Sequence, residues 1–553
     1  MDFISYLRSR NDHEMRRGDI RYSIVLIIML LTVGSNKAQE HGGLLYNVGF
    51  NSIVSNGDYA PFWFTANRNG ASSIKKSSGY ARYGIGYNGF FDEKQQYGYN
   101  ITADILTGYN QTRTFALQQA FAEFTWRWLA ITIGNKERGS EQEYFSRENS
   151  LELFERNHIQ GCYRIYTERY ASLGSGGLAF SGNSHAIPQI RIDVPEYTTI
   201  PGTAGWLKLR GHLSYGIFSD SQYQTDFTRG NPNEKYGRNI LYHSKALFMR
   251  AGRSDKFPLT FEGGLEMHTQ FGGDIYTHGQ GLKVSMPHRP MDFFKAIIPL
   301  GGSDDTPTVE QTNISGNQIG SWHAAFTLHT KCADIRIYGE HMFEDFSQLF
   351  FFEYQQNRHG KRRIIYYPWR DIMIGVNIAN KSKFLPFVHN IRYEYLTTRD
   401  QSGALYHDPS DYFNEQMDGC DNYYNHGIYP GWHHWGMGIG NPLIISPIYN
   451  NNGSLQFASN RVVAHNIGIN GFIKGYFPLA YRLNYTYSEN WGTYANPFSS
   501  KRYTTSLLAE FTYIPNDTNW MGTLSFGCDR SSYIGNNMGL MLTFTHFGKI
   551  FDK

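Results

Sequence analysis

An alternation of apolar and polar residues recurs along most of the chain and constrains its fold more than any other feature. Successive side chains of a β-strand point to opposite faces, so such a pattern predicts strands with one apolar and one polar face. In residues 189–194 the apolar face carries Ile190, Ile192 and Val194, and the polar face carries Gln189, Arg191 and Asp193. The same period marks five longer segments, 206–218, 259–271, 371–380, 387–396 and 538–547.

Further strand-like segments and the turns between them predict a large sheet. They begin near residues 44, 81, 97, 115, 171, 320, 333, 461, 478, 503 and 520. With the shorter segments included, the pattern predicts about 16 to 20 strands, and single-chain bacterial barrels favour even numbers. Many runs are about 9–13 residues long, close to what a tilted strand needs to cross a bilayer. No segment after Ala38 has a convincing helical period.

Two all-β architectures produce this pattern. In a soluble secreted sandwich the apolar face lines a core and the polar face meets water. In a transmembrane barrel the apolar face meets lipid, and the barrel must close so that every backbone N–H and C=O is paired. Aromatic residues near segment ends, as in 124–131 and 364–372, are typical of membrane girdles. The pattern therefore favours an antiparallel transmembrane β-barrel, with the soluble β-protein as the alternative.

The N-terminus predicts export. Basic residues precede the apolar run 24–34, and a small residue at Ala38 offers a cleavage position. The run is too short to span a bilayer, which takes about 20 residues. We therefore expect a cleaved signal peptide at 1–38 and one barrel domain at 39–553, whose largest extracellular loop covers about 398–460.

Charge and cysteine content exclude several classes. The formal net charge of the 553 residues is +3, far from the strong positive field of a nucleic-acid-binding protein, so no nucleic acid is expected as a partner. The four cysteines are widely spaced and match no zinc motif. They allow at most a periplasmic bridge whose partners the sequence does not identify. No cofactor is predicted.

Several segments in series resemble the capsule assembly Wzi family of outer-membrane proteins, in its Bacteroidetes form. They are "GGLAFSGNSHAIPQIRIDVPEYTTIP" (176–201), "LKLRGHLSYGIFSD" (207–220), "YHSKALFMRAG" (242–252), "FPLTFEGGLEMHTQFGG" (257–273), "EHMFEDFSQLFF" (340–351), "CDNYYNHGIYPGW" (420–432), "GIGNPLIISPIYNNNG" (438–453) and "NRVVAHNIGINGFI" (460–473). None is a catalytic signature, so the resemblance rests on the whole series, which spans most of the chain after residue 38.

The resemblance implies a lectin-like, non-enzymatic barrel of about 18 strands in the outer membrane of a Gram-negative bacterium. Such a protein binds capsular polysaccharide and helps to attach or organise it at the cell surface. The implied partners are that polysaccharide, outer-membrane lipid and other components of capsule export. One departure from the enterobacterial form is that a strand begins near residue 44, directly after the predicted cleavage position, so no N-terminal helical bundle is expected.

A basic stripe on the predicted inner wall is the first candidate binding site. It consists of Arg191, Lys208, Arg210 and His212. A guanidinium binds a carboxylate with two parallel hydrogen bonds and an ammonium acts as a point charge, so the stripe suits an acidic polysaccharide. The alternative is an internal charge network balanced by Asp193, Glu262 and Glu266.

The long loop supplies the second candidate site. Its polar and aromatic members are Asp421, Asn422, Tyr423, Tyr424, Trp432 and Trp435. Aromatic rings suit the apolar face of a sugar ring, while the carboxylate and amide bond to its hydroxyls. The alternative is a loop that folds inward, packs on itself and closes the barrel. Both interpretations can hold together.

Catalytic and metal sites are not predicted. Glu262 and Glu266 lie four residues apart on one strand, about 13 Å, which is too far for a glycosidase pair. Adjacent His433 and His434 rarely point to one metal centre. Glu340, Glu344 and Asp345 bind cation-bridged glycan or cap a turn, and the sequence does not decide between the two. Besides a capsule-binding barrel, the chain fits an outer-membrane channel for oligosaccharides or nutrients and, less well, an outer-membrane hydrolase.

Overall fold

The computed structural model describes residues 41–552 except 93, 95, 142–172, 299–315, 345–352, 357–361, 366–369, 383–384, 408–416, 474–478 and 516–517. The predicted signal peptide therefore lies outside the described residues. Within the described part of the chain, no helix is both long and apolar enough to cross a bilayer.

Eighteen antiparallel strands form a closed barrel, which confirms the predicted fold class and strand number. They are β1 (His41–Asn56), β2 (Ser77–Phe90), β3 (Tyr97–Tyr109), β4 (Phe115–Trp126), β5 (Leu129–Asn135), β6 (Gln189–Thr199), β7 (Leu207–Ile217), β9 (Leu241–Ala251), β10 (Leu259–Phe271), β13 (Asn317–His329), β14 (Ala333–Glu344), β17 (Ile372–Asn380), β18 (Val388–Thr397), β23 (Val462–Ile473), β24 (Leu479–Gly492), β25 (Pro497–Tyr513), β26 (Trp520–Ser531) and β27 (Asn537–Asp552).

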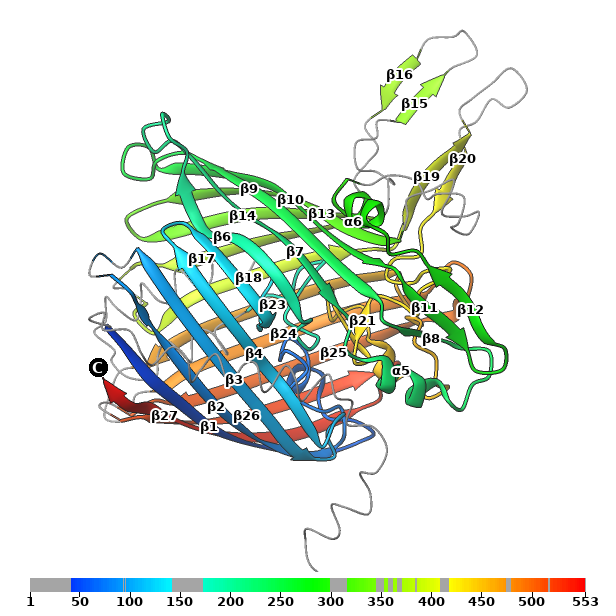
Figure 1. The fold of residues 1–553 in the computed structure, drawn as a ribbon, viewed down its shortest axis with the longest axis horizontal. Helices are drawn as coiled ribbons and strands as arrows, with labels where there is room; N and C mark the ends of the chain where they lie inside the picture. The colour runs from blue at the N-terminus through cyan, green and yellow to red at the C-terminus, as the bar shows by residue number, and fades with distance from the viewer. Residues whose placement is uncertain are drawn as a thin grey trace, which may run out of the picture.

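The barrel closes where its first and last strands pair. β27 runs antiparallel to β1 from Gly43 opposite Asp552 to Asn56 opposite Met538, and the two strands lie side by side in Figure 1. Each of the remaining barrel strands pairs with the barrel strand that follows it in sequence. Closure leaves no unpaired edge, which is the condition for a sheet to lie in hydrocarbon.

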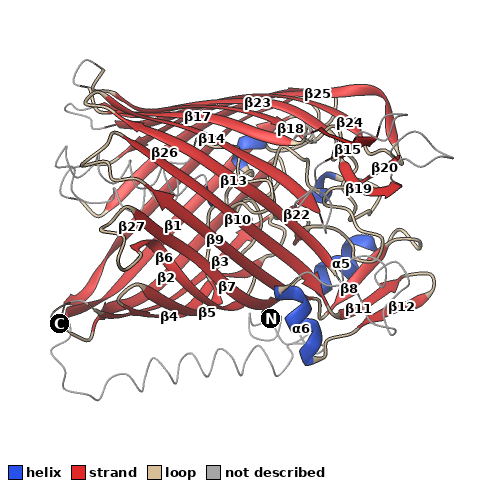
Figure 2. Cartoon of the chain, turned by 90° about the horizontal axis from the view of Figure 1, so that it is seen from above, coloured by secondary structure: helices blue, strands red, loops and turns tan. Residues whose placement is uncertain are grey.

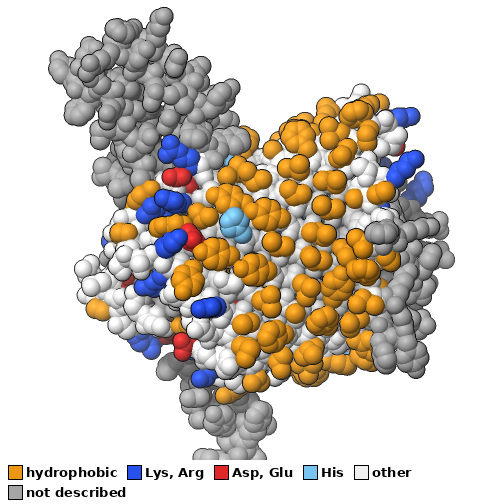
Figure 3. Space-filling view, turned by 180° about the vertical axis from the view of Figure 1, so that it is seen from behind, with side chains coloured by type: hydrophobic (Ala, Val, Ile, Leu, Met, Phe, Trp, Pro, Cys, Tyr) orange, Lys and Arg blue, Asp and Glu red, His pale blue; other side chains and the backbone are white. Residues whose placement is uncertain are grey.

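The outer wall is apolar over most of its height. Ile190 is 58% exposed and Ile192 is 47% exposed, whereas Gln189 and Asp193 are buried inside, as the alternation predicts. Figure 3 shows hydrophobic side chains covering the wall, with most charged side chains near its two ends. An apolar belt on a closed barrel identifies a transmembrane protein of the outer membrane.

The two ends of the barrel differ. One end carries short turns, such as 200–206 between β6 and β7 and 330–332 between β13 and β14. The opposite end carries the long connections, including residues 398–461 between β18 and β23. Short turns face the periplasm and long loops face the exterior in such barrels. We call these the turn end and the loop end.

The loop end holds the remaining secondary structure, and Figure 2 shows loop chain lying within the outline of the barrel strands there. Its small sheets are β8 (Lys235–Arg238) with β11 (Gly273–Thr277) and β12 (Gly281–Met286), β15 (Glu353–Gln356) with β16 (Arg362–Ile365), β19 (Ser402–His407) with β20 (Met417–Cys420), and β21 (His433–His434) with β22 (Met437–Gly438). The described helices are α5 (Ser221–Thr228), α6 (Pro290–Ile297) and the 3-10 turns η2 (Phe62–Phe64) and η3 (Pro447–Tyr449). The two α-helices correct the prediction of no helix after Ala38, since each is only eight residues long, too short for a clear helical period.

Two strand predictions need correction. The strand predicted to begin near residue 171 is not found among the described residues that follow, because 173–188 are coil inside the barrel. The β6–β7 hairpin is present, but β6 continues past Pro195 through a register shift between Val194 and Thr198. Proline lacks a ladder donor and is tolerated at such irregularities, so the turn begins only after Thr199.

Candidate functional site

Three loop segments fold into the loop end of the barrel and form what we call the plug, residues 60–74, 173–187 and 423–457. Phe64, Leu178 and Trp432, one from each segment, are all fully buried and belong to one hydrophobic core. The segments are far apart in sequence but pack together within the ring of strands. The plug therefore fills the lumen at this end with apolar and aromatic side chains.

Carboxylates of the inner wall fix the plug through its backbone. Glu394 accepts the N–H of Ser175 at 2.6 Å, and Glu340 accepts that of Leu178 at 2.6 Å. Glu344 accepts the N–H of Tyr424 at 2.7 Å. Hydrogen bonds to a charged acceptor are about twice as strong as neutral ones, so these carboxylates set the position of the plug. Asp345 lies outside the described residues.

The aromatic residues predicted to stack on sugars lie mostly in this core. Tyr423, Tyr424 and Trp432 have no exposed surface. Their polar atoms are used internally: the Tyr423 hydroxyl donates to Asp371 at 3.0 Å, and the Trp432 indole donates to the carbonyl of Ala179 at 2.9 Å. The inward-folded interpretation of the loop therefore describes these three rings, and a sugar outside the protein does not reach them.

The other predicted loop residues differ in exposure. Asn422 is exposed, whereas Asp421 and Trp435 are half-buried. The Trp435 backbone N–H donates to Asp220 at 2.9 Å, and its ring lies under the guanidinium of Arg113. Asn422 is thus the member of the predicted set that is open to a ligand at the loop end.

The predicted basic stripe is present on β6 and β7, but most of its charges are paired. Arg191 bonds to Asp193 at 2.9 Å, and Arg210 forms an ion pair with Glu141. His212 shares a hydrogen bond with Ser244 at 3.0 Å. The charge-network alternative therefore describes Arg191 and Arg210. Lys208 has no hydrogen-bond or ion-pair partner among the residues that the structure describes.

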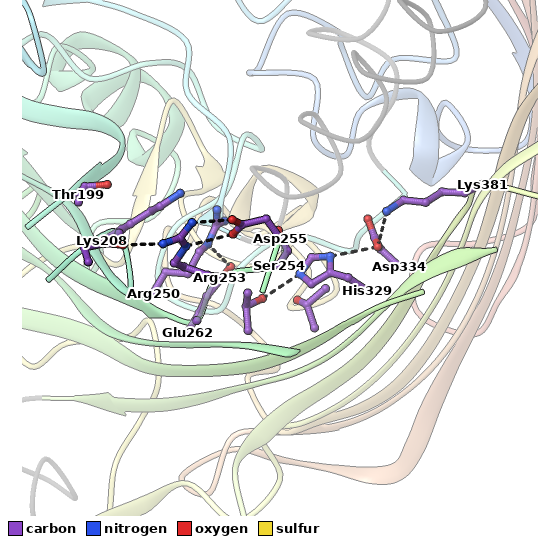
Figure 4. A pocket seen from close by; sticks show the side chains of 15 residues that line it. Thr199, Lys208, Arg250, Arg253, Ser254, Asp255, Glu262, His329, Asp334 and Lys381 are labelled. Carbon is purple, nitrogen blue, oxygen red and sulfur yellow. Dashed lines mark hydrogen bonds and ion pairs between the residues drawn. The ribbon is translucent and has the colours of Figure 1, made fainter. Parts of the chain in front are cut away.

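Lys208 lines a polar chamber of about 600 Å³ at the turn end of the barrel (Figure 4). The lining residues are Thr199, Ala204, Gly205, Lys208, Arg250, Gly252, Arg253, Ser254, Asp255, Thr260, Glu262, Thr327, His329, Asp334 and Lys381. The volume falls within the range of small-molecule sites. The chamber was not predicted from the sequence, because its walls come from the turn ends of four different hairpins.

Ion pairs neutralise most charges of the chamber. Arg253 bonds to Asp255 at 2.6 Å, and Lys381 bonds to Asp334 at 2.6 Å. The hydrogen bonds from Arg253 hold the pKa of Asp255 below its ordinary value, so this carboxylate is ionised at neutral pH. On β9 and β10, Arg250 bonds to Glu262 at 2.8 Å. Because these charges are paired within the chamber, the ammonium of Lys208 is the group available to bind an anionic ligand there.

A second cationic surface, which we call the rim patch, lies at the loop end and consists of Arg399, Arg461, Trp491 and Tyr494. The Arg461 guanidinium lies 3.9 Å from the ring centre of Tyr494, and that of Arg399 lies 5.1 Å from the ring of Trp491. Arg461 also donates to the carbonyl of Arg399 at 3.1 Å. The patch was not predicted, since its arginines lie at opposite ends of the 398–461 loop and its rings lie at the end of β24 and just after it.

The plug contains histidines that burial keeps neutral. Burial lowers the pKa of His433 to about 4 and that of His426 to about 3. His426 Nδ1 accepts the backbone N–H of Ile428 at 3.1 Å and that of Tyr429 at 3.2 Å, so the ring must be unprotonated there. The described atoms near His433 and His434 form no metal-ligand cluster.

Comparison with known proteins finds similarity at the level of architecture. No family model matches the chain, and no curated protein matches it either. Among solved structures, the Escherichia coli protein Wzi, described as an outer-membrane protein of group 1 capsule assembly and a carbohydrate-binding β-barrel, is 12% identical with a TM-score of 0.49. The match covers 95% of this chain and 87% of that one.

Other barrels match to a similar extent. OprD of Pseudomonas aeruginosa is 7% identical with a TM-score of 0.43, covering 93% of this chain and 98% of that one. OccAB4 of Acinetobacter baumannii is 9% identical with a TM-score of 0.43, covering 93% and 100%. Such identities say nothing about function, and the family predicted from the sequence remains a prediction.

Proposed function

We propose that this chain is a non-enzymatic outer-membrane barrel that binds acidic capsular polysaccharide and helps to attach or organise it at the cell surface. The proposal starts from the series of segments that resemble the capsule assembly Wzi family. It adds the rim patch around Arg461 at the loop end, which suits the carboxylates and ring faces of such a polymer at the cell surface. The chamber around Lys208 faces the periplasm, so its ammonium meets only polymer on that side of the membrane.

The observation that carries the proposal is the plug. A diffusion channel needs a continuous polar path, but the loop end of this barrel is filled by a core that includes fully buried Phe64, Tyr424 and Trp432. Backbone hydrogen bonds to the wall carboxylates Glu340 and Glu344 hold that core in place. A barrel closed in this way presents its loop end as a surface for binding.

Retention of a polymer by this protein comes from many weak contacts. A long polysaccharide repeats the same acidic unit, so one chain meets both the rim patch and neighbouring copies of the protein. Linked weak contacts give strong overall retention without a tight single site. The rim patch fits this mode, because its exposed and half-buried arginine and aromatic side chains combine charge with an apolar face.

A deletion strain tests the proposal. We expect a strain without this protein to synthesise capsule but to release it into the medium, and the wild-type gene to restore attachment. Purified protein in planar bilayers is expected to pass little current. Unchanged attachment together with impaired oligosaccharide uptake, or a large stable conductance, favours the channel instead and overturns the proposal.

A further inference from the structure

Three ionisable side chains meet on the inner wall where three neighbouring strands run side by side. Glu266 lies on β10, His323 on β13 and Glu340 on β14. His323 is directly opposite Glu340 in the ladder, and Glu266 is opposite Ser321, two residues from His323. One candidate ligand atom from each of the three side chains lies within 4.8 Å of the other two.

The cluster is buried against the plug. Glu340 has no exposed surface, and the side chains of Glu266 and His323 are 3% and 8% exposed. Glu266 Oε1 is 3.3 Å from His323 Nε2, and Glu340 Oε1 is 4.0 Å from the same nitrogen. Two carboxylates so close together in a dry environment repel each other unless a positive charge lies between them.

A buried oxygen in the cluster lacks a partner. Oε1 of Glu340 accepts the Leu178 N–H, but Oε2 has no hydrogen-bond partner among the described residues, although the side chain is fully buried. The arginines nearest the cluster are engaged elsewhere, because Arg210 pairs with Glu141 and Arg336 bonds to Glu262 at 2.5 Å. A buried carboxylate oxygen left in this way signals a ligand that completes the site.

We propose that Glu266, His323 and Glu340 bind one divalent transition-metal ion of the zinc class. Two carboxylates and one imidazole neutralise such an ion and match its preference for nitrogen and oxygen ligands. Ligands of a tetrahedral zinc site lie about 3.3 Å apart, the separation seen between Glu266 and His323. Glu340 Oε1 lies 4.0 Å from His323 Nε2, so a metal bound between them draws these two atoms closer by about 0.7 Å.

A small cavity adjoins the cluster on the side of the turn-end chamber. This cavity of about 10 Å³, room for about one water molecule, is lined by His323 and Glu262. Glu262 also lines the chamber that contains Lys208. Because Glu340 holds the Leu178 backbone, a metal bound here fixes the plug to the wall. The site is independent of polysaccharide binding and adds a structural function to the barrel.

Zinc titration of the purified barrel tests the site. Protein in detergent is stripped with a chelator and titrated with Zn²⁺ by calorimetry, and bound metal is counted by elemental analysis after dialysis. We expect one Zn²⁺ per chain. His323→Gln and Glu340→Gln are each expected to weaken binding at least 100-fold, whereas His465→Gln, at a half-buried histidine that bonds to Tyr393 outside the cluster, leaves it unchanged.

Co²⁺ provides a readout that does not depend on the folding of variants. Bound to one imidazole and two carboxylates in wild-type protein, Co²⁺ is expected to show visible absorption that Zn²⁺ abolishes and millimolar Mg²⁺ does not. Absence of stoichiometric Zn²⁺, equal competition by Mg²⁺, or full binding by a folded His323→Gln protein each overturns the proposal. The cluster is then an ion network in which a protonated His323 lies between two carboxylates.

Discussion

Trp432 donates its indole N–H to the backbone carbonyl of Ala179 at 2.9 Å, although 253 positions separate the two residues in the chain. The bond joins two plug segments that emerge from different hairpins and meet only inside the barrel. The Trp432 ring also stacks 6.4 Å from Tyr242 of the wall. Plug and wall are therefore one packed unit around this side chain.

Replacing Trp432 is expected to open the lumen. Trp432→Ala leaves a large cavity in a fully buried core, and such truncations cost about 3–5 kcal/mol. The plug then leaves its position in a fraction of molecules, and planar-bilayer conductance rises. Trp432→Phe keeps most of the packing and raises conductance less. Trp206→Ala, at a 44% exposed ring near the turn end, is the matched control, and equal conductance in all variants contradicts the prediction.

Lys208 is expected to contribute to binding of acidic polymer. Lys208→Ala should weaken binding of purified capsular polysaccharide about tenfold, because a charge-assisted hydrogen bond contributes about 1.5–3 kcal/mol. Lys208→Arg retains the charge and most of the affinity, and the difference shrinks as salt rises. As a control, Lys256→Ala removes the same charge from an exposed side chain that is not among the lining residues of the chamber. The prediction fails if the two alanine variants bind alike.

The wall of the barrel was predictable because its physics is local. Each residue of a strand such as β10 faces either lipid or the interior. The alternation of apolar and polar residues therefore predicts the orientation of every side chain. The bounds predicted for that strand, 259–271, are those of the structure. β9 and β5 are absent from the predicted strands. β9 mixes His243 and Lys245 into its outward face, where they interrupt the apolar period.

The plug and the sites were less predictable because they depend on contacts between distant segments. Nothing local distinguishes Trp432 in a core from Trp432 on a surface loop, and the sequence left both interpretations open. Likewise, the charges of Arg210 and Arg336 were visible, but their partners Glu141 and Glu262 come from other parts of the chain. The sequence shows which side chains are charged, but it does not show which of them pair with one another.

The rim patch is expected to hold polymer at the cell surface. Arg461→Ala removes a cation that stacks 3.9 Å from the Tyr494 ring, and with Arg399→Ala it should reduce capsule retained by whole cells severalfold. Arg461→Lys keeps the charge but loses the planar stack, so an intermediate result is expected. The control Arg229→Ala changes an exposed loop-end arginine that pairs only with Asp226 among the described carboxylates. Unchanged retention in the Arg461→Ala, Arg399→Ala double variant, or an equal loss in the control, contradicts the assignment.

Acidification is expected to loosen the plug through His426. Its Nδ1 accepts two backbone N–H groups, and burial lowers its pKa from the ordinary 6.5 to about 3. Above pH 6.5 the ring is neutral whether or not the plug is packed, so its full contribution to stability is present. As pH falls from 6.5 towards 3, the imidazole of an unpacked plug binds a proton that the packed one does not, and the stability of the packed plug falls by up to about 1.4 kcal/mol per pH unit.

Proteolysis of the plug should therefore accelerate between pH 7 and pH 4.5. His426→Asn supplies an acceptor that does not titrate and should flatten this dependence, leaving the part due to His433, whereas His465→Asn should not. An unchanged pH profile in His426→Asn assigns the effect to other groups.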